Sequence, residues 1–170
     1  MKTQRQFDVI KKRAENLLNS QKGGHKQVRI YVDGCFDLMH AGHYNAIRQA
    51  RQMGDYLCAG VNSDSDILKT KGPSIMNDKE RCEIVRHCKF IDDVLPKSPY
   101  TPTLDTLKQV NCDYFAHGDD PCIDSEGVDI TTKFIEHNAF KGFARTPGVS
   151  TTTLTAKLLA LALHNQDEDD

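Results

Sequence analysis

The sequence lacks several features that would place it in other classes of protein. None of its apolar runs approaches the roughly 18 residues of a membrane span. The start, MKTQRQFDVIKKRAENL, has no apolar core and no small-residue cleavage site, so we expect no signal peptide. Lysine and arginine total 22 against 24 acidic residues, so no basic field predicts a nucleic-acid partner. No internal repeat is visible.

The six cysteines are scattered singly, without a C-x-x-C pair. An even count in a short secreted chain would favour a disulfide framework. Because no secretion signal is visible, we expect free thiols in a reducing cytosol, and therefore a cytoplasmic protein. No two cysteines have the spacing of zinc ligands, so we expect no metal site built from the protein.

Strand and helix patterns alternate along most of the chain, which predicts one α/β domain over residues 25–164. The expected strands lie in 28–34, 55–61, 91–100, 112–118 and, as an edge strand, 139–145. The expected helices are 41–53, 77–88, 103–110, 130–138 and 150–163, and 63–73 reads as a charged loop. Helical spacing in 4–18 predicts an N-terminal helical extension within residues 1–24, and residues 165–170 form an expected acidic tail.

This alternation predicts a Rossmann-like, doubly wound parallel sheet with helices on both faces. Ligands of such open sheets bind outside the carboxyl ends of the strands. Four polar clusters fall at those ends: DGCFD with HAGH, KTKGP, SPY with AHGDD, and RTPGVSTT. We therefore expect the chemically important residues to converge on one edge of the sheet.

The stretch RTPGVSTT has the composition of a phosphate-binding turn. Arg145 offers a planar fork for phosphate oxygens, Gly148 allows a ligand to approach the backbone, and Ser150 to Thr152 begin a helix whose free N–H groups favour an anion. The same residues would also make an ordinary helix cap after a turn. The flanking arginine and the three successive hydroxyls favour phosphate.

The two histidines of HAGH could bind a metal, transfer protons, grip phosphate or simply pack. The zinc-protease pattern requires H-E-x-x-H, which is absent here. His40 and His43 are spaced i, i+3 on one helix face, and Gly42 between them indicates that anything larger than a hydrogen must be kept away from the backbone there. Lys69 and Lys71 follow in a loop, where a lysine could neutralise a transferred phosphoryl group, although most such lysines only face solvent.

At this point a family resemblance is apparent. HAGH resembles the H-x-G-H signature of the nucleotidyltransferase superfamily, which includes class I aminoacyl-tRNA synthetases, and RTPGVSTT resembles the R-T-x-G-[IV]-S-T-[ST] signature of its cytidylyltransferase branch. A synthetase would carry a K-M-S-K-S-like loop, which this sequence lacks. The resemblance runs from about residue 28 to 163. It implies a nucleotidyltransferase-type fold and an enzyme that joins CTP to a phosphorylated alcohol and releases pyrophosphate.

Three acceptors are compatible with this branch. The stretches GDYLCAGVNSDSDILKTKGP, SPYTPTLDTL and CDYFAHGDD are most similar to the phosphoethanolamine enzymes of phosphatidylethanolamine synthesis, although Asp119 stands where those commonly have Asn. Phosphocholine enzymes usually have Trp at the position of Tyr100 and a long membrane-binding helix, which we do not expect in a chain ending NQDEDD. Glycerol-3-phosphate enzymes tend to have Trp at the position of Pro121. An ATP-using relative and a non-catalytic CTP-binding module are more remote alternatives.

The resemblance also implies which residues form the site. The expected catalytic residues are His40, His43, Lys71 and Arg145. CTP is expected to contact Gly34, Cys35, Phe36, His43, Lys71, His117, Gly118, Asp119, Asp120, Arg145, Thr146, Gly148, Val149, Ser150 and Thr151. The alcohol phosphate is expected to meet Asp33, Lys71, Tyr100 and His117, with a carboxylate and an aromatic face for its ammonium. Mg²⁺ is expected as an ion carried by CTP, and the domain is expected to pair as a homodimer.

Overall fold

The computed structural model of the chain describes residues 11, 13–15, 18, 26–124 and 127–167. The expected N-terminal helical extension lies largely outside these residues. The strands and helices that the sequence predicts within 28–163 are all present, with ends that differ by a few residues from the expected ones. The helical backbone of the closing helix continues as far as Asp167, into the segment 165–170 that is expected from the sequence to be an acidic tail.

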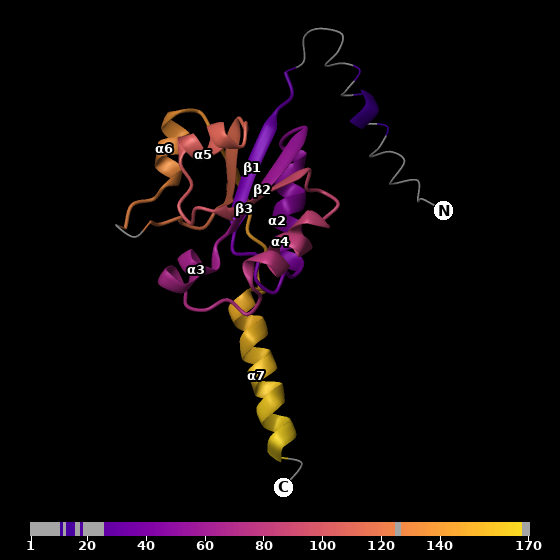
Figure 1. Cartoon of the computed structure of the whole chain (residues 1–170), viewed down its shortest axis with the longest axis vertical. Coiled ribbons are helices and arrows are strands. Elements are labelled where there is room, and N and C mark those ends of the chain that lie inside the picture. Colours follow the sequence, from indigo (N-terminus) through magenta and orange to yellow (C-terminus); the bar gives the residue numbers. More distant parts are fainter. Residues whose placement is uncertain (1–10, 12, 16–17, 19–25, 125–126, 168–170) are drawn as a thin grey trace.

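The sheet has five strands in the order β3-β2-β1-β4-β5 (Figure 1), and every neighbouring pair is parallel. The strands are β1 (Arg29–Gly34), β2 (Tyr56–Asn62), β3 (Asp93–Ser98), β4 (Tyr114–Gly118) and β5 (Phe140–Phe143). The predicted Rossmann-like sheet, with its last strand at an edge, is therefore confirmed. Because β1 has β2 on one side and β4 on the other, the strand order reverses beside it, and such a switch point is where open α/β sheets bind ligands.

Helices cover both faces of this sheet (Figure 1). On one face, α2 (Ala41–Gln52) and α4 (Asp78–Arg86) contribute Ile47 and Val85 to a core shared with the strands. On the other face, α5 (Leu104–Gln109) and α6 (Thr131–Glu136) contribute Leu107 and Phe134 to a second core. The apolar surface buried in these two cores is the main favourable contribution to folding, and it holds the carboxyl ends of the strands in fixed positions.

The segment that the sequence predicts as a charged loop contains a helix, α3 (Asp64–Thr70), so this prediction is wrong. The Ser63 hydroxyl accepts a hydrogen bond from the Asp66 N–H (3.1 Å), and the acidic residues of the first turn suit the positive end of the helix dipole. Ile67 is buried beneath it. Lys71 therefore stands at the C-terminal cap of a helix rather than in a free loop.

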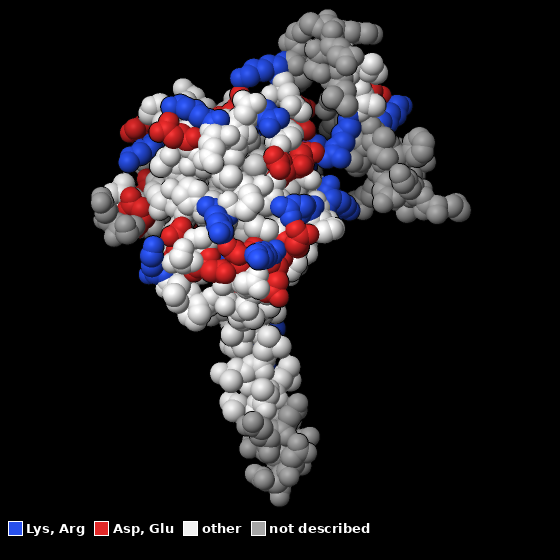
Figure 2. Space-filling model, in the orientation of Figure 1, with Lys and Arg blue, Asp and Glu red and all other residues white. Residues whose placement is uncertain are grey.

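The closing helix, α7 (Thr151–Asp167), extends away from the body of the molecule (Figure 1). Leu158, Leu159, Leu161 and Leu163 are all more than half exposed on it. Figure 2 shows this helix as a mostly white projection, although its sequence includes Lys157, whereas positive and negative side chains are interspersed over the body on the face in view. Within the part of the chain that the structure describes, no helix combines the length and apolar character of a membrane span.

Gly60 on β2 has no room for a side chain. A Cβ atom there would overlap the hydroxyl of Tyr31 and lie 2.6 Å from Ser98 Oγ, and these two hydroxyls share a buried hydrogen bond of 2.6 Å. We expect Gly60→Ala to lower the free energy of unfolding by about 2 to 3 kcal/mol, measured by urea denaturation. The control is Gly142→Ala, whose Cβ would meet only Phe140, at 3.6 Å. Equal stability of the two variants would contradict this account.

Candidate active site

A cavity of about 820 Å³ lies at the carboxyl ends of β1 and β4. It is enclosed by the turn after β1, the start of α2, the segment after α3 and residues 143–159. Most of the site residues expected from the sequence line it, namely Asp33, Gly34, Cys35, Phe36, His40, His43, Lys71, His117, Gly118, Asp120, Arg145, Thr146, Val149, Ser150 and Thr151. Tyr100, Asp119 and Gly148 are not among the lining residues. The expected polar clusters therefore do meet at one edge of the sheet.

The turn from β1 into α2 has an unusual backbone. Phe36 and Leu38 both have positive φ angles, 52° and 45°, and each such residue costs about 1 to 3 kcal/mol. Asp37 between them is buried, and its carboxylate accepts hydrogen bonds from the N–H groups of Ile75 (2.8 Å) and Met76 (3.0 Å). Sequence reasoning placed Asp37 in the DGCFD cluster but gave it no role. It joins this turn to the segment after α3 and so stabilises one wall of the cavity.

The two histidines form the N-terminal cap of α2. His40 is the cap residue rather than part of the helix, and its Nδ1 accepts from the Gly42 N–H (3.1 Å). His43 Nδ1 accepts from the His40 N–H (3.2 Å), and the ring centroids lie 4.0 Å apart. Because each Nδ1 is an acceptor, the neutral rings carry their hydrogen on Nε2. Each imidazole therefore retains one N–H donor for a ligand.

Gly42 makes this arrangement possible. A Cβ atom on Gly42 would lie 2.9 Å from His40 Cε1 and 3.1 Å from Val149 Cγ1. The sequence predicts that no group larger than a hydrogen is tolerated here, and the structure gives the reason, because the His40 ring and the Val149 side chain occupy the space. The glycine thus lets His40 fold over the first turn of α2 while residues of the RTPGVSTT stretch pack against it.

Both imidazoles are uncharged at neutral pH. Burial lowers the pKa of His43 to about 4, and His40 acts in the same direction. Burial, followed by the positive charge of Arg145, also lowers the pKa of His40. The pair therefore presents neutral hydrogen-bond donors, which suit charge that develops on a phosphate more than they suit proton transfer.

The lowered pKa of His43 predicts how stability depends on pH. In the unfolded chain this group titrates near 6.5 and in the folded protein near 4, so its contribution to stability is present above pH 6.5 and is lost as the pH falls towards 4. We expect wild type to lose about 2 kcal/mol more than His43→Gln between pH 7 and pH 4.5 in urea unfolding. Asp33, whose pKa is raised, acts in the opposite sense in both proteins. Parallel pH profiles would contradict the prediction.

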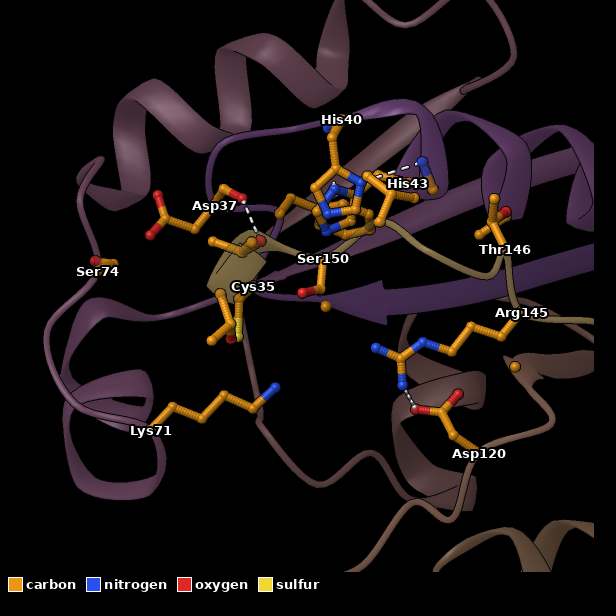
Figure 3. Close-up of a pocket in the computed structure, with 18 of the residues that line it drawn as sticks. Cys35, Asp37, His40, His43, Lys71, Ser74, Asp120, Arg145, Thr146 and Ser150 are labelled. Atoms are coloured by element: carbon orange, nitrogen blue, oxygen red, sulfur yellow. Dashed lines mark hydrogen bonds and ion pairs between the residues drawn. The ribbon is translucent and has the colours of Figure 1, made fainter. Parts of the chain in front are cut away.

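Two cations extend into the cavity opposite the histidines (Figure 3). Lys71 comes from the end of α3, with its Nζ 5.6 Å from the centroid of the Tyr100 ring. Burial alone would lower the pKa of Lys71, but Cys35 and Tyr100 outweigh it and the net shift is upward. Lys71 is therefore fully charged at neutral pH. It also connects Tyr100, which lies outside the cavity lining, to the site.

Arg145, the second cation, is held by two neighbouring acids. Its guanidinium pairs with Asp120, as Figure 3 shows. Nη1 donates to Asp120 Oδ2 (3.0 Å), and the backbone N–H donates to Asp119 Oδ1 (2.9 Å). Asp119 departs from the residue common in the family that the sequence resembles, but the oxygen it uses here is one that asparagine also has. This contact therefore gives no reason to change the expected nucleotide.

The segment 145–152 is attached to the β1–α2 region by side-chain hydrogen bonds. Asn45 Nδ2 donates to Thr146 Oγ1 (2.8 Å), and Thr151 Oγ1 donates to the carbonyl of Asp37 (3.1 Å). Ser150 Oγ accepts from the Thr153 N–H (3.1 Å), so Ser150 caps α7. The sequence leaves open whether these residues bind phosphate or only cap a helix. Ser150 does cap the helix, and the same helix start also lines the cavity.

Arg81 is fully buried behind the site and was missed by sequence reasoning. Its guanidinium donates to the carbonyls of Cys35, Asn62 and Met76 (2.5, 2.9 and 3.1 Å) and to Asp64 Oδ1 (2.6 Å). One side chain therefore joins the ends of β1 and β2 to the segment after α3. Its position in the helix could have indicated burial, because Arg81 lies beside Cys82 and Val85 on the buried face of α4.

Asp33 is the carboxylate at the end of β1. Burial raises its pKa to about 7, against hydrogen bonding from the Asn62 side chain and the charge of Lys71. A bound cation would favour the ionised form of this acid. His117, at the end of β4, also lines the cavity, and its ring centroid lies 5.8 Å from that of Phe115.

The chemistry of the lining fits phosphate more closely than it fits a protein-bound metal. Imidazole N–H groups, an ammonium, a guanidinium and hydroxyls are donors to anionic oxygen. The carboxylates of Asp37 and Asp120 already pair with backbone N–H groups and with Arg145. Among the described residues, no three His, Cys, Asp or Glu side chains gather as metal ligands would.

Comparisons of the sequence with known proteins point to cytidylyltransferases. The sequence profile of the cytidylyltransferase-like family matches residues 31–157. The chain is 48% identical to the ethanolamine-phosphate cytidylyltransferase of Dictyostelium discoideum over 134 residues, which are 79% of this chain and 37% of that protein. It is 37% identical to the choline-phosphate cytidylyltransferase of Saccharomyces cerevisiae over 136 residues, 79% of this chain and 32% of that one.

The chain thus spans about a third of the length of these curated relatives. Among solved structures, the lipopolysaccharide core biosynthesis protein of Thermoplasma volcanium superimposes with a TM-score of 0.60 over 71% of this chain and 99% of that one. At 19% sequence identity this similarity concerns the fold alone.

Proposed function

The chain belongs to the cytidylyltransferase-like family, and from this premise we propose that it transfers the cytidylyl group of CTP to phosphoethanolamine, giving CDP-ethanolamine and pyrophosphate. The observation that supports this most is the convergence of His40, His43, Lys71 and Arg145 around one cavity (Figure 3). Neutral donors and cations on facing walls suit a reaction in which negative charge moves between phosphates.

The proposed reaction is a direct in-line displacement. A phosphate oxygen of phosphoethanolamine attacks the α-phosphorus of CTP, and the bond from that phosphorus to the bridging oxygen of pyrophosphate breaks. Such reactions depend on positioning and charge stabilisation. The Nε2–H groups of His40 and His43 would donate to the α-phosphate and the leaving oxygen. Lys71 would reduce the repulsion between the two phosphates.

Arg145 and the start of α7 would hold the β- and γ-phosphates of CTP. For Arg145 this requires exchange of its ion pair with Asp120 for a phosphate, which is a short movement of one exposed side chain. Ser150 and Thr151 supply hydroxyls at the helix start, where the dipole also favours anions. His117 to Asp120, on the β4 side, would contact the cytidine, with Asp119 acting through the backbone of Arg145.

The acceptor is assigned to the β2–β3 side of the cavity. Asp33 would pair with the ammonium of phosphoethanolamine, and Tyr100 would offer its ring face once Lys71 turns to the phosphates. A primary ammonium donates three hydrogen bonds, which a quaternary one cannot do. The higher identity to an ethanolamine-phosphate enzyme than to a choline-phosphate enzyme, 48% against 37%, supports the same acceptor.

Mg²⁺ belongs to this proposal as the ion that accompanies CTP. The acids nearest the phosphate-binding residues are engaged, Asp37 by two backbone N–H groups and Asp120 by Arg145. This fits an ion held mainly by phosphate oxygens and water. It would neutralise part of the triphosphate charge, while His40, His43 and Lys71 orient the reacting groups.

The experiment that tests the function is pyrophosphate release from CTP with phosphoethanolamine, phosphocholine or glycerol-3-phosphate in separate reactions. We expect kcat/KM to be highest with phosphoethanolamine, and lower with ATP in place of CTP. Higher kcat/KM with either other acceptor would overturn the choice of alcohol. The absence of CTP-dependent release with every acceptor would overturn the enzymatic function and favour a nucleotide-binding module.

A cytosolic location and a homodimeric state belong to the same proposal. All six cysteines are free thiols, which fits a reducing compartment. The exposed leucines of α7 form an apolar surface on the described chain, and pairing of two copies would cover such a surface. Light scattering over a range of concentrations measures the mass directly, and a strictly monomeric protein would contradict the homodimer.

A further inference from the structure

Asn62 is a buried polar residue to which neither the sequence motifs nor the proposed mechanism assigns a role. It is the last residue of β2, only 2% exposed, and it stands at the carboxyl edge of the sheet next to the cavity. It is not among the residues that line the cavity. Buried side-chain amides need hydrogen-bond partners, so the partners of Asn62 indicate what it does.

The side chain of Asn62 joins two parts of the acceptor side. Its Nδ2 donates to the carbonyl of Pro99 (3.1 Å), directly before Tyr100. Hydrogen bonding with the same side chain lowers the pKa of the Asp33 carboxyl, against the raising effect of burial. An amide NH₂ group has two hydrogens, so it can donate to both oxygens at once.

The backbone around Asn62 is also fixed. Its carbonyl accepts from the buried guanidinium of Arg81 (2.9 Å). In the pairing with β3, Val61 lies opposite Pro96 but Asn62 lies opposite Ser98, which leaves Lys97 as an extra residue with φ 51°. A bulge of this kind bends the strand and redirects the residues that follow. It thereby places the Pro99 carbonyl opposite the Asn62 amide.

We propose that Asn62 is a specificity-determining positioning residue, which holds Asp33 and the segment of Tyr100 at the separation that an aminoalcohol phosphate requires. This inference rests on the proposed function, because it assigns the ammonium to Asp33 and Tyr100. Asn62 touches neither substrate. It acts through the direction of one carboxylate and the position of one aromatic ring, while the nucleotide half of the cavity, at β4 and β5, has no contact with its side chain among the hydrogen bonds of the described residues.

The chemistry of the position explains why an amide is suitable there. Leucine has a similar volume but no donor, so Asn62→Leu would leave the Pro99 carbonyl and the Asp33 carboxylate without this partner. Aspartate has the same shape, but Asn62→Asp would place a second carboxyl group against Asp33 and replace two N–H donors with acceptors. Both variants remove the bridge between the two halves of the acceptor site, by different means.

The test compares steady-state kinetics of wild type, Asn62→Leu and Asn62→Asp with phosphoethanolamine and CTP varied separately. We expect KM for phosphoethanolamine to rise about 10- to 100-fold in both variants, as expected for lost buried hydrogen bonds, while KM for CTP stays within about twofold. Thermal unfolding shows which variants fold, and if one fails to fold the other decides. A change smaller than threefold in the acceptor KM of a folded variant would overturn the proposal.

Asn45→Leu is the matched control for the nucleotide side of the cavity, because the Asn45 amide donates a hydrogen bond to Thr146 there. We expect it to raise KM for CTP and leave KM for phosphoethanolamine within about twofold. If Asn45→Leu and Asn62→Leu change both KM values alike, the amides support the fold as a whole and the positioning role is wrong. If wild type itself makes no CDP-ethanolamine, the proposed function has failed, which is a different result from an active wild type with insensitive variants.

A pH profile supplies a readout that a purely structural role would not change. Loss of the Asn62 donor should move the acid limb of kcat/KM for phosphoethanolamine to higher pH, because that hydrogen bond favours ionised Asp33. The titratable groups that face Asp33 are Tyr31, Cys35, Lys71 and Cys122, and all four have pKa values shifted upward. The phosphate of the substrate titrates equally in every variant. An unshifted acid limb in both Asn62 variants would overturn the proposal.

Discussion

His43→Ala is expected to lower kcat by about 10²- to 10³-fold while CTP still binds. The Nδ1 of His43 is occupied by the His40 N–H, so the substitution removes an Nε2–H donor that is held in a fixed direction and is uncharged at neutral pH. Loss of one such donor to a developing negative charge typically has an effect of this size. Pyrophosphate release gives kcat, and calorimetric titration gives the CTP dissociation constant.

The control for this variant is His87→Ala. His87 caps the end of α4, its side chain is 78% exposed, and it is not among the residues that line the cavity. We expect His87→Ala to retain the activity of wild type. Because His43 also belongs to the cap of α2, His43→Ala should lose about 1 kcal/mol of stability, so kcat is measured well below its unfolding temperature. Turnover within threefold of wild type would contradict the assigned role.

Lys71→Met is expected to lower kcat/KM for phosphoethanolamine by about 10²- to 10³-fold. The methionine keeps most of the apolar stem but removes the charge that would lie between two phosphates. A charge pair about 4 Å apart is worth roughly 4 kcal/mol where the effective dielectric constant is about 20. Lys71 lines the cavity, but as a residue it is exposed. Solvent and salt therefore screen part of this energy, and the expected loss stays at or below the full value.

Lys69→Met provides a matched control two residues away on the same helix. The side chain of Lys69 is 74% exposed and lies 3.5 Å from Asp66 on α3, where a salt bridge contributes little. We expect kcat/KM of Lys69→Met to remain within twofold of wild type. If both variants lose activity alike, then α3 acts through its overall charge, and Lys71 has no specific role between the phosphates.

Much of the fold follows from local sequence patterns. The apolar run of β1 ending at Gly34 predicts a buried strand, and the Asn77/Glu80 pair predicts the capping box that the structure shows at α4. The expected family is confirmed, because the two motifs that carry the resemblance lie within the region matched by the family profile. The convergence of the polar clusters follows from parallel strand order, since carboxyl ends of parallel strands share one edge.

Other parts of the molecule could not be predicted in this way. The segment of α3 has one buried apolar residue, Ile67, among charged ones, so its periodicity is too weak to indicate a helix, and only the Ser63 cap hinted at one. Arg81 and Asn62 bind carbonyls from segments far apart in the sequence. No local pattern shows that such carbonyls meet around one side chain, because this depends on the packing of α4 and on the bulge at Lys97.

The order β3-β2-β1-β4-β5 has a consequence for how such a protein can evolve. The groups proposed for the alcohol stand at the ends of β1, β2 and β3, and most of those proposed for the nucleotide stand at the ends of β4 and β5 and at the start of α7. Mutations that redesign one half need not disturb the hydrogen bonds of the other. If the proposed function is correct, a duplicated gene can therefore change the acceptor alcohol of its product through a few substitutions around Asn62 and Tyr100, without altering the residues proposed to bind CTP.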